Sequence, residues 1–387
     1  MLQRTIAPLL LLLFCQSGFA SQAKIDSLLN ELQFAQEDSN KVILLNEVSW
    51  LYHRIQPQRS VEFGTRALQL SKKISYATGQ TYALNRIGIG HLMKGEKSLA
   101  LDYFNQAVDL AGQIGDLKTL SAASNNMGMI YHDYGEFEKA FEYYHRAALM
   151  AEKNKDAKSE CSHLNNLGVL LKEFERYERA QEYYQRALET ARTIGYDLAE
   201  SEILNNIGSV LEEQDRQEEA LGYYEKALQI KKHMDDKVGM TTLLSNIGGV
   251  YASREEYDTA IDYQQQAFNL AATMDYVNGE VLALEGLAAT HHHIGNYKKS
   301  IFYAEKALNK ANQSGQVDQL PYLYDLLSQC YAGLGQYQWA FQFHTEFKRF
   351  SDSLYNDKKN EQINNLEVKF YTDKKEAENK LLKAQQA

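Results

Sequence analysis

The fold of this chain is decided by the stretch LNNLGVLLKEFERYERAQEYYQRALETA, residues 164–191, because closely similar text recurs on both sides of it. Forty residues earlier stands SNNMGMIYHDYGEFEKAFEYYHRAALMA, residues 124–151, and forty residues later LNNIGSVLEEQDRQEEALGYYEKALQIK, residues 204–231. A constant period of roughly 20–50 residues is typical of proteins built from stacked repeats. The sequence therefore predicts an array of one repeated unit.

Each forty-residue unit has the pattern of a helical hairpin. Eight units fill residues 41–360, and in each unit two runs of helical hydrophobic spacing are separated by a short break. The chain contains only three prolines in 387 residues, so the helices are largely uninterrupted. The pattern predicts an all-α protein of eight helical hairpins. Several of the breaks carry glycine, which favours the end of a helix, as at Gly95, Gly135, Gly295 and Gly335.

Small residues recur at three positions of the unit, where helices must approach one another. The twentieth position is alanine or serine in every unit, and the twenty-seventh is alanine from Ala67 to Ala307, followed by Phe347 in the last unit. The eighth position is glycine in five consecutive units. Glycine costs about 1 kcal/mol relative to alanine inside a helix, so this column predicts a close approach of the backbone to the partner helix. The five residues are Gly88, Gly128, Gly168, Gly208 and Gly248.

These columns, together with leucine-like residues at the seventh position and aromatic residues near the twenty-fourth, resemble the tetratricopeptide repeat (TPR). The resemblance covers residues 41–350 and implies a right-handed α-solenoid, a superhelix whose hairpins line a concave ligand groove. The period is forty residues instead of about 34, and no proline ends the second helix. Longer helices are implied, as in the forty-residue repeats of spindle-orientation adaptors. Tyrosine pairs such as Tyr183-Tyr184 are then expected to pack between helices.

The first forty residues lie outside the repeats. Residues 1–20 resemble a secretory signal peptide, because a short apolar run after Arg4 ends in Gly18-Phe19-Ala20, with small residues at a cleavage site. An uncleaved anchor is the alternative, although the run is short for a membrane span. Residues 21–40 have apolar side chains at helical spacing and predict a helix that caps the first repeat.

Residues 351–387 depart from the repeat pattern and predict a charged C-terminal helix or coiled-coil linker. Asp373 interrupts its heptad stripe, so a homodimer through this helix and a single helix docked on the last repeat are both open alternatives. The segment is similar to one that, in Bacteroidetes-type signalling proteins, joins an exported TPR sensor domain to a membrane helix and an output domain. This resemblance implies a membrane tether if the natural chain continues beyond Ala387.

The ligand surface follows from a helical wheel of the first helix in each unit. Apolar residues gather at the fourth, seventh, eighth and eleventh positions, so the second, sixth, ninth and thirteenth positions face away. In the TPR family that opposite face lines the groove. Asparagines at the sixth position can pair with the backbone of an extended peptide, and acidic neighbours favour a polar or basic ligand. The predicted groove residues are Arg86, Asn126, Asp133, Asn166, Glu173, Glu202, Asn206, Glu213 and Asn246.

Structural roles compete with binding at these positions. The fifth position also carries asparagine in four units, which predicts hydrogen bonds between repeats, and the sixth-position residues are equally consistent with a structural amide network. The acidic residues are equally consistent with a solvated face. Only Arg86 matches the basic residues that clamp a terminal carboxylate in some TPR proteins, which argues against recognition of an acidic chain terminus. The fifth-position residues are Asn85, Asn125, Asn165 and Asn205.

Other classes of function find little support in the sequence. A net charge of −10 without a basic cluster argues against nucleic acid as a partner. The neighbouring side chains of His291-His292-His293 point about 100° apart along a helix and do not converge on a metal. Cys161 and Cys330 lie four repeats apart and are expected to be buried free thiols. We therefore expect neither catalysis nor a cofactor, metal site or membrane span in the mature chain.

The sequence as a whole predicts an exported, periplasmic, non-catalytic module that binds a protein or peptide segment as the input part of a signalling receptor. A soluble periplasmic scaffold or assembly adaptor without a sensory role is the main alternative. A metal-dependent enzyme is a remote one.

Overall fold

The computed structural model describes residues 22–315 and 319–352. They fall into two compact units, residues 1–163 and residues 164–387, and the boundary lies inside helix α8 (Ala157–Glu173). The predicted signal peptide and residues 353–387 of the predicted C-terminal helix lie outside the described residues.

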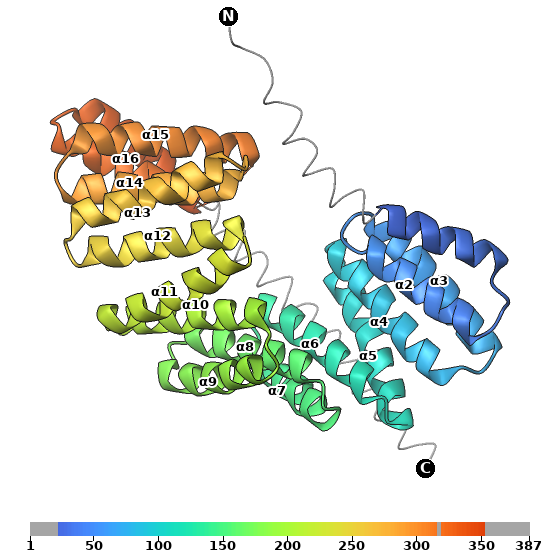
Figure 1. Ribbon diagram of the computed structural model, residues 1–387. Coiled ribbons are helices and arrows are strands. Elements are labelled where there is room, and N and C mark those ends of the chain that lie inside the picture. Colours follow the sequence, from blue (N-terminus) through green and yellow to red (C-terminus); the bar gives the residue numbers. More distant parts are fainter. Residues whose placement is uncertain (1–21, 316–318, 353–387) are drawn as a thin grey trace, which may run out of the picture. The chain divides into compact units, whose positions relative to one another are not determined.

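The first unit begins with a helix over residues 22–34 and continues with helices in antiparallel pairs (Figure 1). Its helices are α2 (Ser39–Tyr52), α3 (Pro57–Lys73), α4 (Ala77–Met93), α5 (Lys97–Ile114), α6 (Leu117–Asp133), α7 (Phe137–Lys153) and the start of α8.

The second unit repeats the same pairing and ends with a helix over residues 337–352. Its helices after α8 are α9 (Tyr177–Thr193), α10 (Asp197–Glu213), α11 (Gln217–His233), α12 (Lys237–Ser253), α13 (Tyr257–Ala272), α14 (Val277–His293), α15 (Tyr297–Ser314) and α16 (Leu320–Gly333).

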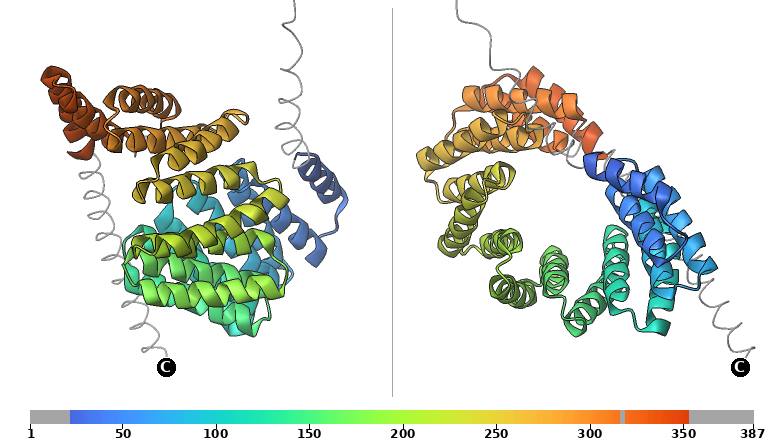
Figure 2. Two further views of the ribbon diagram at one scale, coloured as in Figure 1. Left: turned by 60° about the vertical axis from the view of Figure 1, so that its left-hand side comes forward. Right: turned by 45° about the vertical axis from the view of Figure 1, so that its right-hand side comes forward.

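Within each unit the helix pairs stack in chain order (Figure 2). The first helix of a pair also contacts the first helix of the next pair, as α2 does with α4 and α12 with α14. Successive pairs packed in this way form the predicted solenoid. The described residues contain seventeen helices and no strand, one helix more than eight hairpins would have, because helix 22–34 precedes the first pair.

Helix 22–34 covers the exposed end of the first pair. Ile25 and Leu32 of this helix are buried in one core cluster with Val42 and Leu45 of α2. At the other end, Phe347 packs against a cluster that includes Tyr324, in the column that holds alanine in all earlier repeats. At both ends of the described part of the chain, the residues therefore differ from the repeat pattern at the position where another pair would otherwise stack.

The glycine-bearing breaks are tight turns between the two helices of a pair. Gly95, Gly135, Gly295 and Gly335 have φ between 69° and 79°, a left-handed conformation that glycine adopts without steric cost. In three of the other four turns the equivalent residue is not glycine, yet it keeps a positive φ: 56° at Glu175, 58° at Asp215 and 62° at Glu255. The first pair is the exception, because Ile55 in its turn has no positive φ.

The glycine column allows an aromatic ring, and not the partner backbone, to approach in four of the five repeats. A Cβ atom added at Gly128, Gly168 or Gly208 would lie within 2.7 Å of the tyrosine at the twenty-fourth position, and one at Gly88 within 2.5 Å of Phe104. The expectation of a close backbone approach was therefore wrong for these repeats. In the second unit Tyr184 and Tyr224 are fully buried, so the second tyrosine of each pair packs between helices as predicted.

Candidate functional site

Within each unit the first helices of the pairs carry a set of mainly polar or half-exposed positions on the side away from the fourth, seventh, eighth and eleventh positions. We call the second, sixth and ninth positions of these helices the groove face. In each unit one pocket opens on this face: the Arg86 pocket in the first unit and the Glu285 pocket in the second.

Hydrogen bonds between amides connect neighbouring repeats along the groove face. In the first unit Nδ2 of Asn126 donates to Oδ1 of Asn85 over 3.3 Å. In the second unit Asn206 donates to Asn165, and Asn246 to Asn205, each over 2.9 Å. These three sixth-position residues therefore have a structural partner at the fifth position of the preceding repeat, while their half-exposed side chains still border the surface.

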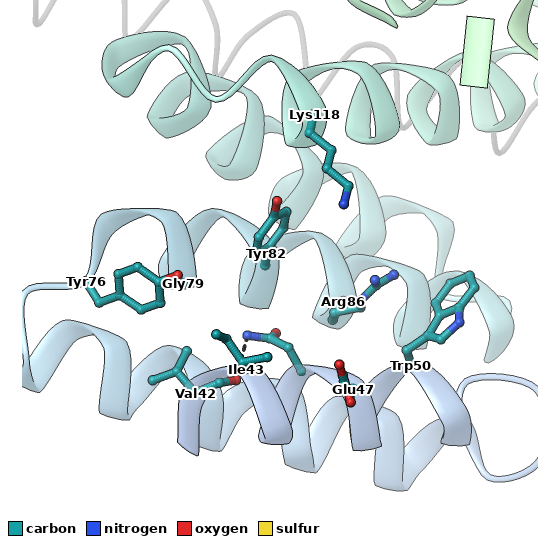
Figure 3. Close-up of a pocket in the computed structure, with 10 residues that line it drawn as sticks. Val42, Ile43, Glu47, Trp50, Tyr76, Gly79, Tyr82, Arg86 and Lys118 are labelled. Carbon is teal, nitrogen blue, oxygen red and sulfur yellow. Dashed lines mark hydrogen bonds between the residues drawn. The ribbon is translucent and has the colours of Figure 1, made fainter. Parts of the chain in front are cut away.

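The Arg86 pocket has a volume of about 320 Å³ and is formed by α2, α4 and the start of α6 (Figure 3). Trp50, Tyr76 and Tyr82 supply aromatic walls, and Arg86 and Lys118 supply positive charge. The full set of lining residues is Val42, Ile43, Asn46, Glu47, Trp50, Tyr76, Gly79, Tyr82, Arg86 and Lys118.

Arg86 is held against one wall of its pocket. Its guanidinium carbon lies 4.4 Å from the centroid of the Trp50 ring, an attractive cation–π geometry. Burial of the guanidinium lowers the pKa of Arg86 from its ordinary value, and no carboxylate of the described residues lies within ion-pair distance of it. The arginine therefore keeps its hydrogen-bond donors for other groups.

Two further polar groups border the same cavity. The side chain of Asn46 is 8% exposed; it donates to the carbonyl oxygen of Val42 over 3.0 Å, and its Oδ1 atom is buried without a partner. Lys118 reaches from α6 toward Tyr82, with its Nζ atom 5.8 Å from the ring centroid (Figure 3). The pocket thus offers a buried acceptor and two cations around an aromatic floor.

The Glu285 pocket has a volume of about 220 Å³ and is formed by α12, α13, α14 and α16. Burial raises the pKa of Glu285 to about 7, and its Oε1 atom has no hydrogen-bond partner. The lining residues are Ser245, Asn246, Gly249, Gln264, Leu282, Glu285, Gly286, Ala289 and Tyr322.

The four acidic residues predicted for the groove lie in different surroundings. Asp133 forms an ion pair with Lys97 over 3.3 Å. Glu173, the last residue of α8, and Glu202 and Glu213 of α10 are exposed. Lys172 directly precedes Glu173 in the sequence. Its Nζ atom donates a hydrogen bond to the hydroxyl of Ser209 in the next repeat over 2.6 Å.

Of the nine predicted groove residues, the structure places two in pockets, Arg86 and Asn246. Asn126 and Asn206 belong to amide pairs, and Asn166 is half-buried on α8. The second and sixth positions, which the helical wheel placed away from the core, line both pockets. The wheel did not include Trp50 and Lys118, the latter because the first helix of this pair begins at Leu117, four residues before the forty-residue unit.

Neither the histidine cluster nor the cysteines form a metal site within the described residues. His291 is buried and stacks on Tyr303 with ring centroids 5.5 Å apart. Within residues 22–315 and 319–352, no group of three His, Cys, Asp or Glu side chains is arranged to hold a metal ion. Cys161 and Cys330 are buried, as predicted.

None of the helices in the described part of the chain combines the length and the apolar character that a membrane span requires.

Comparison with known proteins agrees with this architecture. The sequence model of the tetratricopeptide repeat matches residues 119–193, 159–233 and 239–313. No curated protein matches the chain. Residues 119–233 and 239–313 thus carry tetratricopeptide repeats.

Solved structures of similar fold include three regulators and sensors. The apo quorum sensor NprR from B. thuringiensis has 17% identity and a TM-score of 0.63, with 88% of this chain and 95% of that chain covered. A STAND protein with a TPR sensor from Pyrococcus horikoshii has 17% identity and a TM-score of 0.61, with 82% and 49% covered. The Rap conjugation gene regulator of plasmid pLS20, in complex with the Phr* peptide, has 14% identity and a TM-score of 0.50, with 87% and 98% covered.

Proposed function

We propose that this protein is a non-catalytic module that binds an extended protein or peptide segment, and that the Arg86 pocket anchors that segment. The observation that carries the proposal is the half-buried guanidinium of Arg86, which is stacked on Trp50 and has no carboxylate partner among the described residues. An arginine that is oriented before its ligand arrives loses less conformational entropy on binding, so the stacking of Arg86 on Trp50 favours a binding role. Peptide binding by the pLS20 Rap regulator, named in its structure, is consistent with this use of the fold.

The chemistry of the pocket favours an acidic group beside an apolar one. Arg86 and Lys118 outnumber the single acid, Glu47, which is exposed. Charge-assisted hydrogen bonds from a guanidinium to a carboxylate are about twice as strong as neutral ones. Trp50 and Tyr82 offer ring faces to a neighbouring apolar side chain. The polar or basic ligand expected from the sequence is therefore not the ligand that this pocket favours.

A peptide-display experiment tests this function. Residues 21–387 would be used to select binders from a random peptide library, and the affinities of the selected peptides would be measured by calorimetry. Arg86→Ala is expected to weaken binding by at least about tenfold, because a hydrogen bond to a charged group contributes roughly 1.5–3 kcal/mol.

Arg66→Ala is the matched control, because Arg66 also stacks on an aromatic ring of the first unit, that of Phe63, but lies outside the pocket. It should leave affinity unchanged. Failure to select any peptide, or equal effects of the two substitutions, would refute the proposed role of the pocket.

We further propose that this binding serves as the periplasmic input of a signalling receptor. The support is the signal-peptide pattern of residues 1–20 and the linker-like composition of residues 351–387. A periplasmic scaffold or assembly adaptor is the alternative function. Sequencing the gene past Ala387 separates them: a membrane span within the next few dozen codons supports the receptor, and a stop codon there removes it.

A further inference from the structure

The amide pairs of the second unit end where the sixth position stops being asparagine. Asn246 is the last donor of the series. In the two following repeats the sixth position is Gly286 and then Leu326, neither of which has a side-chain amide. The fifth-position acceptors that these residues would have served are Ser245 and Glu285. Their Oγ and Oε1 atoms are both buried and have no hydrogen-bond partner.

The missing side chain at Gly286 also leaves the space of the Glu285 pocket, about 220 Å³, open beside these two atoms. A buried acceptor without a partner costs roughly 1–3 kcal/mol, and more for a charged group. Two such atoms in one cavity have no partner within the protein and are therefore available to the hydrogen-bond donors of a ligand.

We propose that the Glu285 pocket binds a guanidinium or primary ammonium group of the captured segment, with the Glu285 carboxylate as its counter-ion and the Ser245 hydroxyl as a second acceptor. This inference rests on the proposed binding function and assigns a second, oppositely charged subsite to it.

The composition of the pocket selects a cation that carries several donors. Ser245 and Glu285 offer acceptors, and no Lys or Arg lines the cavity. Asn246 commits Nδ2 to its neighbour, which leaves its Oδ1 atom for a ligand. Leu282 and Ala289 supply apolar surface for the aliphatic stem of a lysine or arginine side chain. Tyr322, which is half-exposed, also lines the cavity.

A ligand of minimal size tests the subsite directly. The probes are N-acetyl-arginine amide, N-acetyl-lysine amide and, as the neutral isostere of arginine, N-acetyl-citrulline amide. Methyl NMR signals of Leu282 and Ala289 report on the cavity. We expect saturable shifts with the two cations and none with citrulline. Equal shifts with arginine and citrulline would overturn the proposal, because charge would then play no part.

Three variants of the full chain complete the test. Glu285→Gln should abolish the shifts, whereas Glu225→Gln, which removes an equal charge from an exposed residue of α11 outside the pocket, should preserve them. Gly286→Asn restores the asparagine of the other repeats and should close the pocket while the protein stays folded. A Cβ atom there would lie 3.0–3.3 Å from three side-chain atoms of Gln264, so this buried side chain, which accepts a hydrogen bond from Thr290, has to shift by a few tenths of an ångström. Cation binding that survives both Glu285→Gln and Gly286→Asn would overturn the assignment.

The two proposals can fail separately. If peptides selected by the chain bind Glu285→Gln as tightly as the wild type and show no enrichment in lysine or arginine, the subsite is refuted and the binding function stands. If the cationic probes shift the Glu285 pocket but no peptide is selected, the general function is refuted and the cation site stands as a small-molecule site.

Discussion

The Arg86 pocket and the Glu285 pocket occupy equivalent positions of the repeat and carry opposite charges. Each lies on the groove face of its unit, next to an asparagine at the sixth position, Asn46 in one and Asn246 in the other. In each case the next sixth-position residue is not asparagine: it is Arg86 in the first pocket and Gly286 in the second. Arginine at this position places a cation in the first pocket. Glycine at this position leaves the Glu285 carboxyl of the second pocket without an amide neighbour.

The regular repeats provide the contrast. Where the sixth and fifth positions are both asparagine, the amides bond to one another, as in the pair of Asn206 with Asn165. Where the series changes, polar atoms are left without partners, as at Asn46, Ser245 and Glu285. The recurring residues therefore stabilise the solenoid, and the departures from them mark candidate ligand sites. Substitutions in the two kinds of region should accordingly change stability in opposite directions.

The largest effect is expected in the regular part, at Tyr184. This ring is fully buried and fills the space left by Gly168. Tyr184→Ala should lower the free energy of unfolding by about 3–5 kcal/mol, the usual cost of deleting a buried aromatic ring. Tyr184→Phe should cost little, because the buried hydroxyl has no partner to lose. Urea denaturation measures the free energy of unfolding of both variants. Similar losses in Tyr184→Ala and Tyr184→Phe would contradict the claim that the ring, and not the hydroxyl, fills the space beside Gly168.

The opposite sign is expected at Glu285. Burial raises its pKa from 4.5 to about 7, so the folded protein holds this proton more tightly than the unfolded chain does. Wild-type stability is therefore lost as the pH rises from about 4.5 to 7, whereas Glu285→Gln lacks this dependence. At pH 8 the variant should be more stable by about 3 kcal/mol, and at pH 4 the two should be nearly equal. Thermal unfolding at both pH values checks this, and a stability difference independent of pH would contradict it.

A smaller effect is expected from the amide pairs. Removal of one amide in Asn206→Ala or Asn165→Ala should lower the free energy of unfolding by about 1 kcal/mol, since the remaining polar group is half-exposed and water replaces part of the bond. The double variant should lose less than the sum of the two single losses. A double-mutant cycle by urea denaturation measures this coupling, and strict additivity would show that the pair is not a structural contact.

The smallest effect is expected at the turn between α12 and α13. Glu255 has a φ of 62°, in a place where other repeats have glycine. Glu255→Gly should raise the free energy of unfolding by roughly 0.5–1 kcal/mol, because glycine adopts this conformation without a Cβ clash. Gly295→Ala, at the equivalent turn of the next repeat, is the reciprocal variant and should lower it. Calorimetry measures the melting temperature of both variants. If Glu255→Gly and Gly295→Ala shift it in the same direction, the turn does not favour glycine.

The features that could be predicted from the sequence are those imposed by the same physical requirement in every repeat. The forty-residue period, the turn glycines and the capping role of Ile25 and Leu32 were all predicted, because each follows from local propensity or from the need to cover a stacking face. The candidate sites were predicted less well. Arg86 and Asn246 were placed on the groove face, whereas Lys118 and Glu285 were missed. The break in the sixth column at Gly286 was nonetheless visible in the sequence and is the signal that could have led to Glu285.

The sequence by itself therefore determined the helical hairpin, its number of copies and the helix face left free of the core, since spacing along a helix sets which side chains share a face. Only the tertiary structure decided which polar groups on this face have a hydrogen-bond partner within the protein. A hydrogen bond such as that from Asn246 to Asn205 joins residues forty-one positions apart, and the open acceptor of Glu285 depends on a side chain that is absent from the next repeat. Polar satisfaction is a property of neighbours in space, and helical periodicity does not encode it.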